Sequence, residues 1–272
     1  MSVTSAMFTG VSGLLNNGEA MNVIGNNISN VNTVGFKQGR TLFSDLLSQS
    51  AGSNAQIGKG VQLQAVQNTF TQGTTQTSEN VTDLAIQGNS FFALNVPSTA
   101  AGAATTPSGA LLTRAGAFHV DPNYFLVNPD GYKVLDTAGA PIQFTNTGTA
   151  PTTDFGRITK IDTNGVISYL ATDGVTLNTA QTVGVVTVPD PTALTKMGGS
   201  LYKGSAAAAL PAAFAAPNGT SEQVLSNSLE QSNVDMASEF VKMIVTQRAY
   251  SANSKTITTS DQMTQEVLGL IR

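Results

Sequence analysis

The chain carries near its N-terminus the run Met21-Asn22-Val23-Ile24-Gly25-Asn26-Asn27-Ile28-Ser29-Asn30-Val31-Asn32-Thr33-Val34-Gly35-Phe36-Lys37. Apolar residues recur in it and before it with a helical period, at Met7, Leu14, Met21, Ile24, Ile28 and Val31. Such a repeat predicts a helix with one apolar seam. The residues between them are mostly asparagine, serine and glycine, which are weak helix formers. Two interpretations remain open: a helix that becomes stable only against a partner, and an ordinary terminal helix packed on its own domain.

The C-terminal end of the chain predicts a second helix, from about Val234 to Ile271, with Asp235 capping or charging its start. Apolar residues return there every three, four or seven positions, at Phe240, Met243, Ile244, Tyr250, Ile257, Leu268 and Ile271. A helix of that length spans ~55 Å at 1.5 Å per residue, far more than an average globular helix. We expect the two ends to pair as a coiled-coil-like helical domain, with both sets of apolar positions forming an assembly seam.

The middle of the chain predicts strands. All ten prolines lie between Pro97 and Pro217, and proline is excluded from helix interiors. Short alternating apolar segments with turn signals between them indicate an antiparallel, sandwich-like or barrel-like β domain. One hairpin is expected where Leu84-Ala85-Ile86 and Phe91-Phe92-Ala93-Leu94 flank the turn signal Gln87-Gly88-Asn89.

The predicted fold class is therefore α+β, with a β domain inserted between two terminal helices. We expect residues 1–45 and 228–272 to form the helical assembly domain. Residues 46–80 are expected to form an extended connector, because Ser48 to Gly60 is rich in serine, glycine, asparagine and glutamine. Residues 81–227 are expected to form the β domain.

Composition excludes several classes of function. The net charge is −4, only 11% of the residues are charged, and no basic cluster is present, which argues against a nucleic-acid surface. Cysteine is absent and His119 is the only histidine, so disulfides, thiol nucleophiles and most histidine-based metal sites are excluded. No apolar run approaches the ~20 residues of a membrane span. No cleavable signal peptide is expected, because a basic head followed by an apolar region is missing.

The few candidate chemical motifs are better explained by structure. His119 beside Asp121 lacks a nucleophile and an oxyanion hole, and is more typical of a surface strand. Gly58-Lys59-Gly60 lacks the frame of a phosphate loop. Asp130-Gly131 and Asn164-Gly165 are typical of turns rather than of calcium ligands. We therefore predict no catalytic, cofactor-binding or metal-ligating residues, no cofactor and no small-molecule substrate, and a chain that binds other protein.

Both ends of the chain resemble the terminal signatures of the bacterial flagellar rod and hook axial proteins. Similar stretches lie in the middle, at Asp83-Leu84-Ala85-Ile86-Gln87-Gly88 and Thr113-Arg114-Ala115-Gly116-Ala117-Phe118. The resemblance covers nearly the whole chain, at several points in the same order. The residues that carry it at the two ends are Asn26, Asn27, Asn30, Gly35, Phe36, Lys37, Ser232, Asn233, Val234, Gln247 and Arg248.

The resemblance implies a structural subunit of the flagellar hook, the flexible joint that transmits torque from the rod to the filament. Hook proteins usually carry a larger outer domain, for which residues 140–182 are too short, so we expect a minimal hook protein with this segment at the insertion point. The alternative within the family is a subunit of the distal rod, which is a stiff drive shaft. A more distant alternative is a ligand-binding β domain with helical tails.

The resemblance also implies partners and a location. The subunit would be exported unfolded by the flagellar type III apparatus without signal cleavage. It would polymerise with itself into a helical tube in the basal body or hook, outside the cell. Other axial proteins would lie at the ends of the polymer: the rod, the hook cap and the hook–filament junction.

Overall fold

The computed structural model describes residues 3–46, 58–95, 106–144, 155–171, 174–219 and 222–270. The chain folds into two compact units. The helical unit contains residues 1–31, 38–69 and 234–272, and the β unit contains residues 32–37 and 70–233. The predicted α+β class, with helices at both ends and an antiparallel β domain inserted between them, is confirmed.

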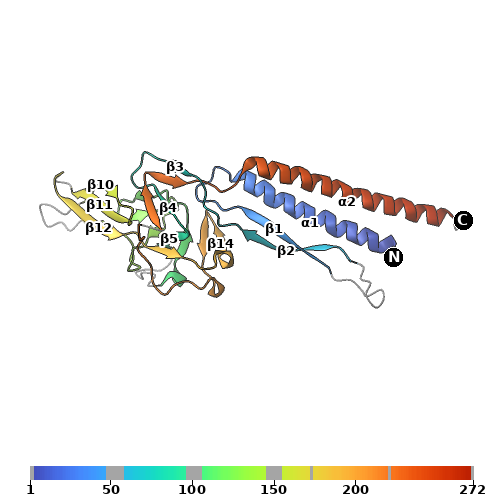
Figure 1. Ribbon diagram of the computed structural model, residues 1–272, viewed down its shortest axis with the longest axis horizontal. Coiled ribbons are helices and arrows are strands. Elements are labelled where there is room, and N and C mark those ends of the chain that lie inside the picture. The colour runs from blue at the N-terminus through green and yellow to red at the C-terminus, as the bar shows by residue number, and fades with distance from the viewer. Residues whose placement is uncertain are drawn as a thin grey trace. The chain divides into compact units, whose positions relative to one another are not determined.

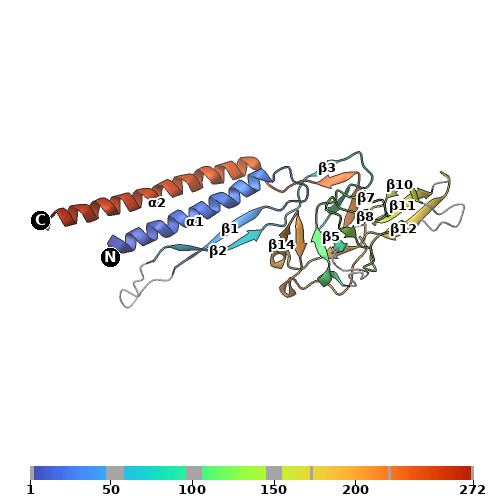
Figure 2. The same cartoon turned by 180° about the vertical axis from the view of Figure 1, so that it is seen from behind.

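The helical unit is built on two long antiparallel helices. Helix α1 (Val3–Ser29) and helix α2 (Met236–Leu270) lie side by side, with the start of α1 and the end of α2 together (Figure 1). Strands β1 (Gly39–Asp45) and β2 (Val61–Asn68) pair antiparallel and lie along α1, as the reverse view also shows (Figure 2). The helical unit is therefore a helix pair with a β ribbon packed on it.

The structure divides the chain differently from the predicted domain boundaries. The alternating apolar residues from Val61 onward form β2, which pairs with β1 and so joins residues 38–69 to the helical unit. Residues 32–37 follow α1 directly, yet they belong to the β unit. Residues 47–57 of the expected connector lie outside the described residues.

The β unit contains short strands, and every strand pair described in it is antiparallel. The largest sheet has the order β14-β15-β6-β5-β9-β8-β7, with β13 also paired to β5, and β10-β11-β12 form a separate sheet. Three 3₁₀ turns lie at Pro107–Gly109, Pro191–Ala193 and Ala206–Ala208. The strands are β3 (Thr75–Thr77), β4 (Leu84–Gln87), β5 (Ser90–Asn95), β6 (Leu111–Thr113), β7 (His119–Val120), β8 (Leu126–Val127), β9 (Lys133–Val134), β10 (Phe155–Ile161), β11 (Val166–Ala171), β12 (Leu177–Thr182), β13 (Val185–Thr187), β14 (Thr195–Gly198), β15 (Leu201–Lys203), β16 (Gln223–Ser226) and β17 (Ser228–Glu230).

The expected hairpin between β4 and β5 is wrong. Strand β4 pairs with β16, and β5 pairs with β6, β9 and β13. Leu84, Ala85 and Ile86 are all buried, so β4 does not have the exposed face that a simple hairpin strand would show. The two strands on either side of Gln87-Gly88-Asn89 therefore belong to different sheets.

The role of residues 140–182 as the insertion point of a larger outer domain stays a prediction. The described part of this segment contains β10, β11 and β12, which form a sheet of their own. Ile161, Ile167 and Tyr169 of this sheet are buried in the main apolar cluster. Strands β10 and β11 thus contribute side chains to the core of the β unit.

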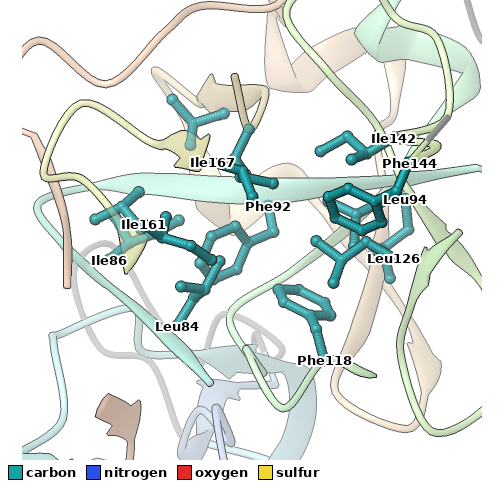
Figure 3. Packing of buried hydrophobic residues seen from close by; sticks show 14 of the residues in the cluster. Leu84, Ile86, Phe92, Leu94, Phe118, Leu126, Ile142, Phe144, Ile161 and Ile167 are labelled. Carbon is teal, nitrogen blue, oxygen red and sulfur yellow. The ribbon is translucent and has the colours of Figure 1, made fainter. Parts of the chain in front are cut away.

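The core of the β unit is aromatic and aliphatic (Figure 3). Phe92 of β5 lies at its centre and packs edge-on against Phe118, with ring centroids 5.2 Å apart. A second cluster around Phe91 and Tyr202 lies on the other face of the same strand. Because β5 is covered on both faces, it is the strand on which the β unit is assembled.

Truncating Phe92 to alanine is expected to cost about 3–5 kcal/mol of unfolding free energy, because it removes a fully buried ring and leaves a cavity. Leu177→Ala is the matched control, since Leu177 is exposed on β12. Equilibrium urea unfolding of the full chain, followed by near-ultraviolet circular dichroism, measures both. A loss below ~1 kcal/mol for Phe92→Ala would contradict this description of the core.

Candidate assembly surface

The contact between α1 and α2 contains two glycines of α1, which face Asn253 and Ile257 of α2. A Cβ atom added at Gly10 would lie 2.9 Å from Cγ1 of Ile257, and one added at Gly13 would lie 2.6 Å from Nδ2 of Asn253. Ala20 of α1 and Ser260 of α2 are also buried. Glycine at two positions three residues apart allows the helix backbones to approach closely, so the contact needs few large side chains.

The predicted seam residues do not form one buried stripe. Ile24 is buried. Met7, Leu14, Met21, Ile28, Val31, Met243 and Ile257 are half-buried. Phe240, Ile244, Tyr250 and Leu268 are exposed, and Ile271 lies outside the described residues. Some of the predicted seam residues are thus buried or half-buried, and others are exposed on the surface of the helix pair.

The large apolar side chains that remain face away from the helix contact. Phe8 and Leu15 of α1 are 75% and 63% exposed, and Ile244 of α2 is 50% exposed. Positions three, four and seven apart share a face of one helix, so Phe8 and Leu15 lie on the same face of α1. We define the outer apolar stripe as Phe8, Val11, Leu15, Phe240, Val241, Ile244, Val245, Met263, Val267 and Leu270, all of which are exposed.

Sequence reasoning missed most of this stripe. The predicted seam contains Met7 and Leu14, which are seven residues apart. The next residues, Phe8 and Leu15, have the same spacing but were not predicted as seam residues. The signal that could have separated the two rows is the position of the glycines. Gly10 and Gly13 mark the face that contacts the other helix, and the row opposite that face is the exposed one.

A hollow of about 440 Å³ lies on the helix pair beside the stripe. Its lining is Leu14, Leu15, Gly18, Glu19, Met21, Asn22 and Tyr250. A Cβ atom added at Gly18 would meet no atom within 4 Å, so this glycine leaves space that the chain itself does not fill. Exposed apolar side chains beside a hollow are typical of a protein interaction site.

Gly18→Ala is expected to stabilise α1 by about 0.5–1 kcal/mol, because alanine is the better helix former and the site is open. Gly10→Ala should lose that gain, since the new methyl group would press on Ile257. Thermal melting of the helical circular dichroism signal of the full chain compares the two variants. Equal stabilisation by both would contradict the close contact at Gly10.

A buried polar cluster ties α1, α2 and β1 together within the helical unit. Asn27 Nδ2 donates to Gly39 O at 2.8 Å and to Glu239 Oε2 at 3.0 Å, and Gly39 N donates to Asn27 Oδ1 at 3.0 Å. Glu239 Oε1 accepts from Gln38 Nε2 at 2.8 Å and from Lys242 Nζ at 2.6 Å. These residues line a cleft of about 360 Å³, and within it they satisfy each other's hydrogen bonds.

A second buried cluster lies in the β unit, around the carboxylate of Glu230. Lys37 Nζ is 2.6 Å from Glu230 Oε1, and Arg114 Nη1 is 3.2 Å from Glu230 Oε2. Gly73 N also donates to Glu230 Oε1, at 2.9 Å. The Lys37 and Glu230 side chains are 1% and 0% exposed, and burial lowers the pKa of the Lys37 ammonium although Glu230 opposes the shift. A buried carboxylate with two cations and a backbone donor is held in one geometry.

The same cluster holds residues 32–37 in the β unit. Gly35 has a φ of 67° and lies so close to Ala115 N that a side chain would collide with it, and Gly35 N donates to Glu230 O at 2.8 Å. Phe36 is buried, with Lys196 Nζ 4.3 Å from its ring centroid. The structure therefore explains why the family motif has Gly35, Phe36 and Lys37 at these positions.

The other motif residues are placed less uniformly. Asn26 is exposed, and Asn30 Nδ2 donates to Asn26 O at 2.8 Å. Ser232 and Val234 are buried, and Asn233 Nδ2 donates to Thr71 Oγ1 at 2.8 Å. Gln247 and Arg248 are exposed on α2. Sequence reasoning did not single out Glu230, because nothing nearby in the chain shows that Lys37 and Arg114 converge on it.

Glu230→Ala is expected to destabilise the β unit by about 3–5 kcal/mol, because it leaves the buried cations of Lys37 and Arg114 without their anion. Lys160→Ala, which breaks the exposed pair with Asp162, should cost less than ~1 kcal/mol. Urea unfolding of both full-length variants provides the comparison. Similar small losses would show that the buried cluster is not needed for stability.

The chemical motifs of the sequence do not assemble into a reactive site. His119 is exposed on β7, and the Asp121 carboxylate accepts from Asn123 N and Phe125 N at 2.9 and 2.8 Å, as in a turn. Among the described residues, no group of three or more histidine, cysteine, aspartate or glutamate side chains is placed to hold a metal ion. Over the same residues, no helix is both long and apolar enough to cross a membrane.

Three family models match the chain in order. Residues 7–37 match the family described as flagella basal body rod protein. Residues 85–169 match the flagellar hook protein FlgE/F/G D1 domain, and residues 225–270 match the flagellar basal body rod FlgEFG protein C-terminal family. The matched segments thus include most of α1, much of the β unit and all of α2.

Two basal-body rod proteins match over nearly their full length, and a hook protein matches in part. The flagellar basal-body rod protein FlgG of Bacillus subtilis is 36% identical over 280 residues, covering 98% of this chain and 99% of that protein. FlgG of Borreliella burgdorferi is 32% identical, covering 95% of each chain. The flagellar hook protein FlgE of the same organism is 41% identical, but over 114 residues that cover 36% of this chain and 26% of that protein.

Proposed function

We propose that this chain, which belongs to the family of bacterial flagellar rod and hook axial proteins, is a distal-rod subunit of the flagellar basal body. It is a structural flagellar protein and not an enzyme. The observation that carries the choice of rod is the end-to-end similarity to basal-body rod proteins. Similarity to a hook protein is confined to about a third of the chain.

The sequence alone favoured a hook subunit, and the comparisons favour the rod alternative instead. The N-terminal stretch, which favoured a hook in the sequence, matches a family described as flagella basal body rod protein, so it does not single out a hook. Length separates them better, since a rod protein is matched from end to end while the hook protein is matched over 26% of its length. A ligand-binding β domain with helical tails has no support from these relatives.

In the proposed assembly, the outer apolar stripe is covered by neighbouring copies of the chain. Burial of apolar surface is the main favourable term in protein association. Identical copies joined by one repeated, non-closing contact form a helical polymer. The low charge of the chain limits repulsion between these copies.

The same proposal includes export through the flagellar type III apparatus without signal cleavage. It also includes contacts with other axial proteins at the ends of the polymer. The weak helix formers of α1 support it, because a helix of this kind unfolds easily before assembly. The hook cap and the hook–filament junction, which were expected as partners of a hook, give way to neighbouring rod and hook subunits. The proposed location is the basal body, beyond the membrane through which the chain is exported.

Electron microscopy of the purified, concentrated chain tests the function directly. A rod subunit should give straight, stiff tubes, because a drive shaft must not bend. Curved tubes would support a hook subunit instead. A chain that stays monomeric at high concentration would contradict self-assembly.

Ile244→Asp is expected to prevent polymerisation and to leave the β unit folded, because it places a charge in the outer apolar stripe. Leu177→Asp is the matched control, since it puts the same charge on an exposed apolar position of the β unit. Sedimentation of the polymer and circular dichroism of the soluble fraction measure the two effects. Normal polymers from Ile244→Asp would argue against the stripe as the assembly surface.

A further inference from the structure

The hollow beside the outer apolar stripe contains the one charged residue of α1, Glu19. All the residues that line the hollow, except Tyr250 of α2, belong to α1. The Glu19 side chain is exposed and forms no ion pair within the described part of the chain. The hollow thus combines large apolar side chains with a carboxylate that has no cationic partner among these residues.

Helix α2 offers the complementary pair of side chains, Ile244 and Arg248. Ile244 is 50% exposed, and Arg248 follows it by four residues, so the two share a face of the helix. Arg248 is exposed and makes no ion pair with any residue that the structure describes. Lys242 differs, because its ammonium already pairs with Glu239. An apolar side chain and an available cation therefore lie one turn apart on α2.

These two features lie on opposite sides of the helix pair. Gly13 of α1 faces Asn253 of α2 across the contact between the helices. Leu15, which lines the hollow, follows Gly13 by two residues and so points about 200° away from it. Ile244 precedes Asn253 by nine residues, which is two and a half turns at 3.6 residues per turn. One copy therefore cannot fill its own hollow with Ile244, whereas the Ile244 of a second copy beside it can.

We propose that Ile244 of one copy inserts into the α1 hollow of the next copy, while Arg248 of the first pairs with Glu19 of the second. The hollow of about 440 Å³ has room for a large side chain, because a Cβ atom added at Gly18 meets no atom within 4 Å. A contact between two different surfaces of the same chain repeats from copy to copy, as a helical polymer requires. The proposal deepens the assembly proposed above and rests on it.

The other exposed apolar residues near the start of α2 fit the hollow less well. Val245 directly follows Ile244, so it points about 100° away from the face that lies opposite the helix contact. Phe240 and Val241 precede Arg248 by eight and seven residues, which is more than ~10 Å along the helix. Ile244 is therefore the residue that places an apolar side chain and the Arg248 cation together on the outer face.

Filling the hollow of the full chain tests the apolar part of the contact. Gly18→Leu is expected to raise the critical concentration for polymerisation at least about tenfold, because it occupies the space that Ile244 needs. Gly25→Leu is the matched control and should stay within about twofold of the unchanged chain. Gly25 is also a glycine of α1 whose added Cβ would meet no atom within 4 Å, but it does not line the hollow.

A second change in the Gly18→Leu variant identifies the residue that enters the hollow. Adding Ile244→Ala should lower the critical concentration again by at least about threefold, because the smaller side chain leaves room for the new leucine. Adding Val245→Ala should give no such recovery. Sedimentation of the polymer over a series of protein concentrations measures each variant.

Charge reversal tests the polar part of the contact. Glu19→Arg and Arg248→Glu should each raise the critical concentration about fivefold, because each turns an attraction that repeats in every copy into a repulsion. The double variant should return to within about twofold of the unchanged chain. Glu19→Arg with Lys255→Glu is the control, since Lys255 is another exposed cation of α2 on the same face as Arg248, and this variant should not recover.

The outcomes separate this contact from the proposed function. Recovery in the two matched double variants alone supports the contact. Equal inhibition by Gly25→Leu, equal recovery with Lys255→Glu, or a critical concentration that Gly18→Leu and the single reversals leave unchanged overturns it, while the assembly itself stands. A chain that does not polymerise without any substitution would overturn the proposed function and the contact together. Circular dichroism of each variant as a monomer verifies that the β unit is folded.

Discussion

The contact between α1 and α2 is the constraint on which the assembly surface depends. Gly10 and Gly13 bring the two backbones close together, and they face Ile257 and Asn253 of α2. A contact of this kind buries little apolar area, so it stabilises the isolated pair weakly. The large apolar side chains are left on the outside, where only another molecule can cover them.

The β unit differs from the helix pair in where its large side chains lie. Its largest side chains are buried around Phe92 and Phe91, and its polar interior is organised by the carboxylate of Glu230. That carboxylate holds Lys37, and with it the segment of chain that leaves α1. The β unit therefore buries its large apolar side chains within itself, while the helices leave many of theirs exposed.

The sequence predicted the helices, the inserted β domain and the family well, because period, proline placement and terminal motifs are local signals. It predicted the pairing of β4 poorly, since Leu84, Ala85 and Ile86 show no alternation that reveals a partner far along the chain. The role of Glu230 was missed for the same reason: its partners lie 193 and 116 residues away. The exposed row of α1 was missed because its spacing equals that of the half-buried row beside it.

Amide hydrogen exchange on the monomer and on the polymer tests the central claim most directly, that the helix pair is an assembly element with a weak internal contact. In the monomer, amides of α1 and α2 should exchange quickly while those of β5 and its neighbours are protected. In the polymer, α1 and α2 should become protected as well. Helices that are already as protected in the monomer as the core of the β unit would contradict the claim.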